Sequence, residues 1–261
     1  MADFVLLMGA SFIATIGLMT ILWLVYLIRK NAGIVDLGWC VSFLLVGSIY
    51  LYLGQGFWVR KWVLAGMIFI WAGRLLSYLM NRYIHTEEDP RYVQIREAWG
   101  SQHSNAKFLL LYWFQGLLVV ILSICFLIAF RDPNPYWYPM QTWGLLFWLL
   151  GVGGEALADY QLETFKKDPL NNARVCNKGL WNYSRHPNYF FEWITWIGFC
   201  LYGWSSPFGI FTLISPIIML ILLVRISGIP LTEAHLLKAK GDAYRDYQNT
   251  TSSFIPWIKM R

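Results

Sequence analysis

Apolar segments of membrane-spanning length recur along the whole chain, and shorter polar stretches separate them. A transmembrane helix needs about 20 consecutive, mainly apolar residues. The pattern predicts seven such helices, near 4–28, 35–54, 62–80, 108–130, 142–161, 189–204 and 209–228. The composition agrees, because 57% of the residues are hydrophobic and only 14% are charged. With no internal repeat or linker, the chain is predicted to be an all-α polytopic membrane protein in which residues 1–261 form one integral domain.

Lysine and arginine are distributed unevenly between the predicted loops. Sixteen of them lie in the first, third and fifth loops and in the C-terminal tail, whereas the opposite face has only Arg60, Lys61 and Arg131. Because cytoplasmic loops are enriched in Lys and Arg, the N-terminus is predicted to lie outside and the C-terminus in the cytoplasm. The net charge of +6 follows from the same bias, suits anionic membrane lipids and requires no nucleic-acid partner.

The predicted cytoplasmic face also carries the longer polar segments, 81–107, 162–188 and 229–261, so we expect the chemistry to take place there. The four cysteines are widely spaced and include no CxxC pair. They are therefore interpreted as small buried hydrophobic residues, and no metal site is expected.

The segment Ser184–Tyr189 places several polar side chains at the mouth of the sixth predicted helix. Arg185, His186 and Asn188 lie within four residues, and Glu192 follows Asn188 at i+4. Burying such groups costs several kcal/mol unless something binds them. The segment therefore predicts a polar ligand site at the membrane interface.

Other helices carry polar residues that also need an explanation. Glu155 and Asp159 lie one turn apart on the fifth helix, where they could pair with Arg74 or Arg225 or form a hydrogen-bonding wall for a polar cofactor. Arg225 follows about sixteen apolar or small residues and should have an anionic partner. The run 151–154 contains three glycines and predicts close helix packing.

Two residues could serve the chemistry directly. Asp36, near the start of the second helix, is either a helix cap or a catalytic group. Tyr78 shares a face of the third helix with Arg74 and is either a hydrogen-bond donor to a substrate carbonyl or an interfacial tyrosine.

Several of these segments together resemble a known family. The chain is similar to the steroid 5α-reductase superfamily, and above all to its bacterial-type branch, described as the domain of unknown function DUF1295. The resemblance rests on Trp181–Phe190, Asp159, Tyr160, Lys166, Arg225, the closing 244–257, and, for the branch, Ile34–Trp39, Asp89–Tyr92, Trp99 and Gly100. It implies a seven-helix enzyme of the bacterial inner membrane, with NADPH in a cytoplasm-facing cavity of the half 140–261. A lipophilic enone, such as a steroid-like 3-oxo-Δ4 lipid, would enter from the membrane.

The resemblance also implies roles for particular residues. The positions that would contact NADPH are Glu155, Asp159, Lys166, Asn188 and Arg225, with Arg185 and His186 close by. The remaining candidates for cofactor binding are Arg74, Tyr189, Glu192 and Glu233. The family's catalytic Gln-Glu pair is absent, and Asp36 alone stands in the comparable region. The family's tyrosine on the third helix has no clean counterpart, because Trp71 lies three residues before Arg74 and Tyr78 one turn after it. Asp36 and Tyr78 are therefore the candidate catalytic residues.

Two alternatives to the reductase remain open. Membrane methyltransferases that use S-adenosylmethionine also carry an Arg-His-Pro-x-Tyr element, and Glu233 after Arg225 could complete such a site. The basic residues near the site favour the phosphates of NADPH over S-adenosylmethionine, which has none. A non-catalytic lipid-binding or transport protein is the other alternative, although a site at one face, without an inverted repeat, is not typical of transporters.

Overall fold

The computed structural model describes residues 2–85, 88–100, 104–171 and 174–258, and most of these residues are helical. Within them there is no β-strand, only an isolated parallel bridge between Ser184 and Ser252. The chain divides into two compact units, Met1–Tyr138 with Gly203–Ser215 and Pro139–Tyr202 with Pro216–Arg261. The prediction of one integral domain is not tested by this division and stays a prediction.

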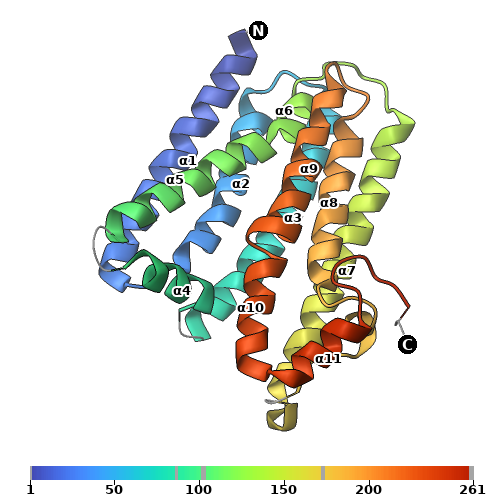
Figure 1. The fold of residues 1–261 in the computed structure, drawn as a ribbon. Helices are drawn as coiled ribbons and strands as arrows, with labels where there is room; N and C mark the ends of the chain where they lie inside the picture. The colour runs from blue at the N-terminus through green and yellow to red at the C-terminus, as the bar shows by residue number, and fades with distance from the viewer. Residues whose placement is uncertain (1, 86–87, 101–103, 172–173, 259–261) are drawn as a thin grey trace. The chain divides into compact units, whose positions relative to one another are not determined.

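The first unit consists of long helices and their short connections (Figure 1). Its helices are α1 (Ala2–Arg29), α2 (Ile34–Leu53), α3 (Trp58–His85), α4 (Pro90–Trp99), α5 (Ser104–Leu122) and α6 (Ile124–Phe130), with the 3₁₀ turn η3 (Gly209–Leu213). Helix α1 packs on α2 and α5, and α2 packs on α3. The core is aromatic, because the buried Phe43 ring meets Trp71 at 5.1 Å and Phe126 at 6.1 Å.

The second unit consists of α7 (Pro139–Lys167), η1 (Pro169–Asn171), η2 (Gly179–Asn182), α8 (Pro187–Gly203), α9 (Ile214–Ile221), the π-helical turn η4 (Leu222–Ile226), α10 (Ile229–Lys240) and α11 (Asp242–Thr250). Glycines bring α7 and α8 into close contact. A Cβ atom on Gly144 would lie 2.5 Å from the Tyr202 nitrogen, and one on Gly151 would lie 2.5 Å from the Thr195 nitrogen. The prediction that the glycine run 151–154 permits close packing is confirmed.

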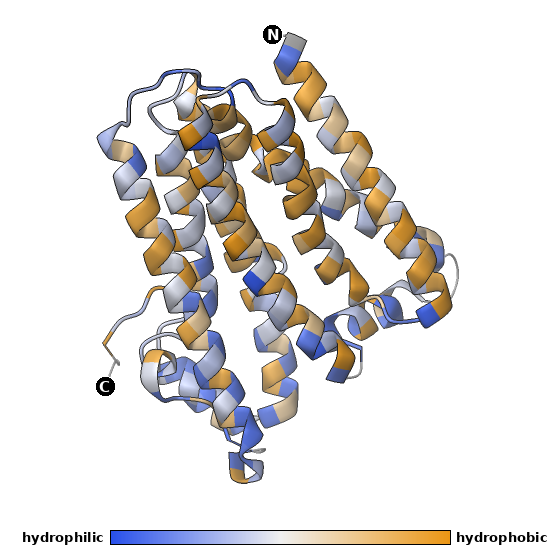
Figure 2. Ribbon diagram, turned by 180° about the vertical axis from the view of Figure 1, so that it is seen from behind, coloured by the Kyte–Doolittle hydropathy of each residue, from blue (hydrophilic) through white to orange (hydrophobic). Residues whose placement is uncertain are grey.

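Five helical segments are long and apolar enough to cross a membrane, namely Asp3–Arg29, Ile34–Leu53, Trp58–His85, Ser104–Phe130 and Gly209–Lys240. Figure 2 shows that hydrophobic residues cover most of the length of the helices and that hydrophilic residues gather toward their ends. The chain is therefore an integral membrane protein with an all-helical fold. The predicted spans at 142–161 and 189–204 are helices, but α8 has only 17 residues and α7 includes glycines and carboxylates. Seven spans and the orientation stay predictions.

Three local features differ from the sequence interpretation or refine it. The predicted span 108–130 is interrupted at Ser123, whose hydroxyl donates to the Val120 carbonyl at 2.8 Å. Asp36 is not the cap of α2, because Gly33 holds that position and Asp36 lies in the first turn. The predicted span 209–228 is also irregular, since the chain leaves the α-helix in η4 and resumes it at Ile229.

Arg60 was assigned to an outer loop, but the structure buries it near the start of α3. Its Nη1 atom lies 2.6 Å from the Asp132 carboxylate, and both side chains are at most 2% exposed. Nη2 donates to the Tyr136 carbonyl at 2.8 Å. Within the first unit this ion pair joins the start of α3 to the segment after α6.

Candidate functional site

The polar motif folds into a tight corner between η2 and α8. Gly179 opens the corner with a φ of +58°, a value that L side chains rarely adopt. Pro187 then begins α8, where its missing N–H has no partner to lose. The Ser184 hydroxyl accepts from the His186 backbone N–H at 3.1 Å, which fixes the chain just before the helix.

Arg185 is held by other parts of its own chain. Its Nε donates to Glu233 Oε1 at 2.7 Å, and its Nη1 donates to the carbonyls of Gln248 at 2.9 Å and Thr251 at 2.5 Å. The side chain is 10% exposed. Most of its donor capacity is therefore directed to the protein, whereas the motif predicted a cofactor contact.

His186 shares the same carboxylate. Its Nε2 lies 3.1 Å from Glu233 Oε1, and its ring stacks on Tyr189 with centroids 5.3 Å apart and planes 6° apart. Burial lowers the pKa of the imidazole, and the Glu233 carboxylate opposes that shift only in part. The structure thus favours a neutral imidazole whose Nε2 proton points to Glu233.

Glu233 is the centre of this group, which we call the Glu233 cluster: Arg185, His186, Glu233 and Gln248. The second carboxylate oxygen of Glu233 accepts from Gln248 Nε2 at 2.7 Å. Beside the cluster, the hydroxyl of Tyr189 on α8 lies 3.1 Å from the Oγ1 atom of Thr232, the residue before Glu233 on α10. The cluster therefore joins α8, α10 and α11. Sequence reasoning missed Gln248 and Thr232, because nothing in their local pattern distinguishes them from solvated residues.

Asp159 and Asn188, both predicted to contact the cofactor, come together between α7 and α8. Asn188 Nδ2 donates to Asp159 Oδ1 at 3.4 Å. The Oδ1 atom of Asn188 is buried and has no hydrogen-bond partner among the described residues. Glu155 lies one turn before Asp159 on α7, and both carboxylates are 5% exposed.

Glu192 lies one turn after Asn188 on α8 and is 8% exposed. Its Oε1 accepts from Trp196 Nε1, one turn further along α8, at 2.9 Å. The helical spacing of this part of the motif is confirmed, and Glu192 has an internal partner.

Two predicted cations lie at the ends of helices in the second unit. Lys166 is exposed in the last turn of α7. Arg225 is exposed in the π-helical turn η4, and the described part of the chain offers it no hydrogen-bond or ion-pair partner. Short π-helical turns occur frequently at functional sites.

Asp36 belongs to a polar network in the first unit. Its Oδ1 accepts from the Tyr92 hydroxyl at 2.6 Å, and its Oδ2 accepts from Arg91 at 2.9 Å and Arg82 at 3.5 Å. Burial, reinforced by Asp36, raises the pKa of the Tyr92 phenol, so that Tyr92 remains a donor. As a donor to substrate, Asp36 would have to release these partners.

The same network anchors α4 through Asp89. Asp89 caps the helix by accepting from the Arg91 backbone N–H at 2.9 Å. Burial would raise the pKa of the Asp89 carboxyl, but the hydrogen bonds and charge of Arg91, with the charge of Arg82, lower it. The sequence interpretation noted 89–92 as part of a family pattern and gave these residues no role.

Arg74 and Tyr78 are half-buried and lie one turn apart on α3, as predicted. Trp71, one turn before them, is fully buried in the aromatic core. The catalytic role of Tyr78 and the cofactor role of Arg74 stay predictions.

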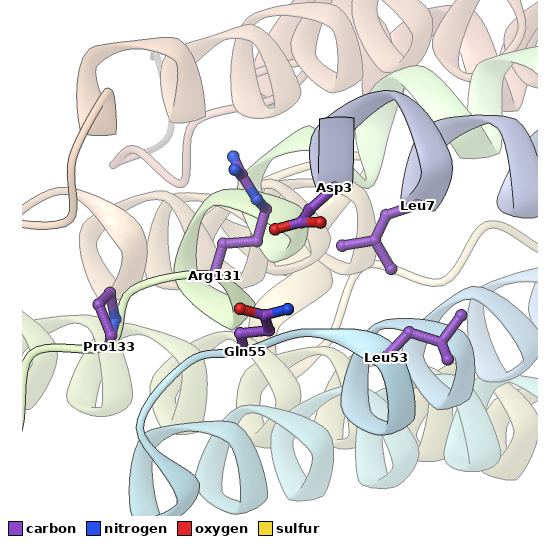
Figure 3. Close-up of a pocket in the computed structure, with 6 residues that line it drawn as sticks. All are labelled: Asp3, Leu7, Leu53, Gln55, Arg131 and Pro133. Carbon is purple, nitrogen blue, oxygen red and sulfur yellow. The ribbon is translucent and has the colours of Figure 1, made fainter. Parts of the chain in front are cut away.

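Two small pockets occur in the first unit. One is lined by residues from α1, the end of α2, the 54–57 turn and the segment after α6. Figure 3 shows its six lining residues: Asp3, Leu7, Leu53, Gln55, Arg131 and Pro133. It contains no predicted site residue. The other is lined in part by Asp36, Arg82 and Asp89.

Comparison with known proteins identifies relatives of the chain. The family model described as "Protein of unknown function (DUF1295)" matches residues 22–251. An uncharacterized protein of Schizosaccharomyces pombe is 26% identical over 70% of this chain and 60% of its own length. The 3-oxo-5-alpha-steroid 4-dehydrogenase 2 of Rattus norvegicus is 27% identical over 53% of this chain and 51% of its own.

A further relative is the 3-oxo-5-alpha-steroid 4-dehydrogenase 1 of Mus musculus, which is 32% identical over 29% of this chain and 31% of its own. The chain thus spans at most three-fifths of the length of these relatives. No solved structure matches significantly. Since the family model covers nearly the whole sequence, the chain belongs to the DUF1295 family, and its distant similarity to 3-oxo-5-alpha-steroid 4-dehydrogenases agrees with the resemblance to the steroid 5α-reductase superfamily.

Proposed function

We propose that this protein is a membrane-embedded, NADPH-dependent reductase that reduces the C=C bond of a lipophilic enone, such as a steroid-like 3-oxo-Δ4 lipid. The observation that carries the proposal is the combination of five membrane-length helices with similarity to proteins named 3-oxo-5-alpha-steroid 4-dehydrogenases. An apolar substrate of this kind would reach the protein from the bilayer.

The residues of the second unit fit NADPH in two respects. The buried Asn188 Oδ1, which lacks a hydrogen-bond partner among the described residues, could accept from a ribose hydroxyl or an amide of the cofactor. Arg225, exposed and without a described partner, has the charge and fork geometry that suit a phosphate. Asp159, Glu155 and Lys166 would complete the binding residues.

When bound, NADPH would supply the hydride. The protein has to stabilise the negative charge that develops on the enone oxygen and to exclude water around it. We propose Tyr78 as the donor to that oxygen. Asp36 is the alternative donor to the enone oxygen. In that role it would act from within the polar network of the first unit, where it accepts a hydrogen bond from the Tyr92 hydroxyl at 2.6 Å.

The arrangement favours the reductase over the methyltransferase. In the methyltransferase hypothesis Glu233 would hold S-adenosylmethionine, yet both of its carboxylate oxygens already accept hydrogen bonds from Arg185 and Gln248. A cofactor group at Glu233 would have to displace one of these bonds, and breaking a charge-assisted bond of this type costs about 1.5–3 kcal/mol.

Thermal unfolding of the purified protein in detergent tests the cofactor, with NADPH, NADH or S-adenosylmethionine added at increasing concentration. A bound species raises the unfolding temperature as its concentration exceeds its dissociation constant. We expect stabilisation by NADPH and a smaller effect in Asn188→Ala and Arg225→Ala. Stabilisation by S-adenosylmethionine alone would favour methyl transfer, and no stabilisation by any of the three would favour a non-catalytic lipid-binding protein.

Consumption of NADPH on addition of a 3-oxo-Δ4 steroid, followed by absorbance at the nicotinamide band, tests the reaction. We expect the saturated ketone as the product, formed by addition of the hydride to the C=C bond and uptake of a proton from water at the adjacent carbon. A matched 3-oxo steroid that lacks the C=C bond is the control, because it suits the same apolar region and offers no conjugated double bond to the hydride.

We further propose that the protein lies in a bacterial inner membrane with seven spans, the N-terminus outside and the site facing the cytoplasm. The excess of Lys and Arg on one set of loops supports this orientation. Reporter fusions at the two termini test it, because an odd number of spans places the termini on opposite sides.

A further inference from the structure

The C-terminal segment returns to the polar motif and pairs with it (Figure 1). The Arg185 backbone N–H donates to the Ser252 carbonyl at 2.8 Å, and the Ser184 hydroxyl donates to the Phe254 carbonyl at 2.8 Å. Trp257 N–H donates to the Tyr183 carbonyl at 2.9 Å. These bonds join residues about 70 positions apart, so they are built by the tertiary fold.

Aromatic side chains fix the same segment against α8 and the corner before it. Phe254 is 8% exposed and meets Phe190 at 5.7 Å and Trp193 at 5.9 Å. From α11, the buried Tyr247 hydroxyl donates to the carbonyls of Trp181 and Ser184, the latter at 3.2 Å. Burying several aromatic groups stabilises the closed arrangement.

The segment also reaches the candidate site through the Glu233 cluster. The side-chain Nε2 of Gln248 donates a hydrogen bond to Glu233, and the backbone carbonyl of Gln248 accepts one from Arg185. Arg185 in turn donates to Glu233, which faces His186 at 3.1 Å. Residues of the C-terminal segment thereby orient both Arg185, which precedes His186 in the chain, and Glu233, which His186 contacts.

We propose that residues 244–257 form a clasp that closes over the segment 176–186 and positions Glu233 and His186. In this proposal Arg185 and Gln248 are positioning residues that act through Glu233 and do not touch the cofactor. The positioning part rests on the proposed function, because it concerns the same NADPH site. The closure of the clasp does not depend on that function.

Cys176 offers a reporter for this closure. It belongs to the segment 176–186, it is 7% exposed, and burial raises the pKa of its thiol. Because alkylation requires an accessible thiolate, the closed clasp should protect Cys176. The other three cysteines are also buried, and mass spectrometry of the alkylated peptides distinguishes the four sites.

The experiment measures the rate at which N-ethylmaleimide alkylates Cys176 in the folded, detergent-solubilised protein. Gln248→Ala removes the side-chain bond to Glu233, and Arg185→Lys keeps the charge but loses the fork that binds Glu233 and two carbonyls. Asn249→Ala is the matched control, since Asn249 is the exposed neighbour of Gln248 on α11. We expect alkylation to be about tenfold faster in the first two variants, the effect of losing one charge-assisted hydrogen bond, and unchanged in the control.

A reciprocal exchange separates a specific contact from general loosening. Gln248→Glu places a second carboxylate against Glu233 and should also speed the alkylation. Combining it with Glu233→Gln restores the pair in reverse, with Gln at position 233 as the donor and Glu at position 248 as the acceptor. We expect the alkylation of Cys176 in this double variant to return to the wild-type rate. If the double variant is as fast as Gln248→Glu alone, the contact between Gln248 and Glu233 is not what closes the clasp.

NADPH affinity then tests the positioning role. We expect Gln248→Ala to weaken NADPH binding about tenfold and Asn249→Ala to leave it unchanged. Unchanged alkylation in both Gln248→Ala and Arg185→Lys overturns the clasp, whether or not NADPH binds. Faster alkylation with unchanged NADPH affinity overturns the positioning role. If wild-type protein does not bind NADPH, the proposed function and the positioning role both fail, while the alkylation rates still decide the closure.

Discussion

Replacing Gly151 by alanine is expected to force α7 and α8 apart. A Cβ atom at this position would lie 2.4 Å from Thr195 Oγ1, 2.5 Å from the Thr195 nitrogen and 2.8 Å from the Phe191 carbonyl oxygen. Real Cβ atoms essentially never approach heavy atoms this closely. Two of the three atoms are backbone atoms of α8, so a change of rotamer cannot relieve the contact. The helix itself has to move.

The magnitude follows from two opposing effects. Overpacking a tight core costs about 1–3 kcal/mol, and the backbone contacts place Gly151→Ala toward the upper end of that range. Alanine also favours a helix over glycine by about 0.5–1 kcal/mol. We therefore expect Gly151→Ala to lower the free energy of unfolding by about 2 kcal/mol. The matched control is Gly153→Ala on the same helix, which meets nothing within 4 Å and should raise it by about 0.5–1 kcal/mol.

Equilibrium unfolding in mixed detergent micelles measures both variants against the wild type. NADPH binding provides a second measurement, because α7 carries Asp159 and α8 carries Asn188, whose side chains meet at 3.4 Å. A shift between the two helices should separate this pair and weaken the binding of NADPH in Gly151→Ala alone. Equal stability of the Gly151 and Gly153 variants would refute the reasoning, since it would mean that the contact between the helices is not tight.

Three further predictions follow from other parts of the structure. Arg60→Met should destabilise the protein by about 3–5 kcal/mol because it leaves Asp132 buried without its partner, whereas the double variant Arg60→Met/Asp132→Leu should recover most of the loss in the same unfolding assay. Asp36→Asn should lower turnover more than NADPH affinity if Asp36 serves the chemistry; equal turnover would make it a structural residue. The pKa of His186 is lower in the folded protein than its unfolded value of about 6.5. As the pH falls below about 6.5, the unfolded state therefore binds a proton at this residue before the folded state does. The stability that the neutral imidazole contributes above that pH is lost as the pH falls toward the folded pKa. The unfolding temperature should therefore decline between pH 7.5 and 5.5 more steeply in the wild type than in His186→Asn.

The hydrophobic pattern predicted the helices well because the length of an apolar segment is a local property. Asn188 and Glu192 show the same for the site, since their i, i+4 spacing places both of them on one face of α8. Spacing along one helix is fixed by its 3.6-residue period, so no tertiary information is needed.

Long-range pairs could not be predicted in this way. Arg60 follows a polar turn and was interpreted as a loop residue, but its partner Asp132 lies 72 positions away. Gln248 reaches Glu233 from another helix, and nothing in the sequence around Gln248 marks it as a partner of Glu233. Such contacts depend on which helices pack together, and the local pattern around each residue does not determine that.

The arrangement of charge in the second unit distinguishes two arginines, Arg185 and Arg225, that the sequence places at or near the cofactor. The Arg185 guanidinium already donates to one carboxylate and two carbonyls and has little left to offer a ligand. Arg225 has no described partner and is exposed, so most of its attraction is available to an anion. An exposed charge is screened by salt, whereas a buried ion pair is screened much less. NADPH affinity should therefore fall as ionic strength rises in wild type, and this salt dependence should become shallower in Arg225→Ala but persist in Arg185→Gln, which also removes one charge. A salt dependence that becomes shallower in Arg185→Gln and persists in Arg225→Ala would return the phosphate contact to Arg185 and remove it from the clasp.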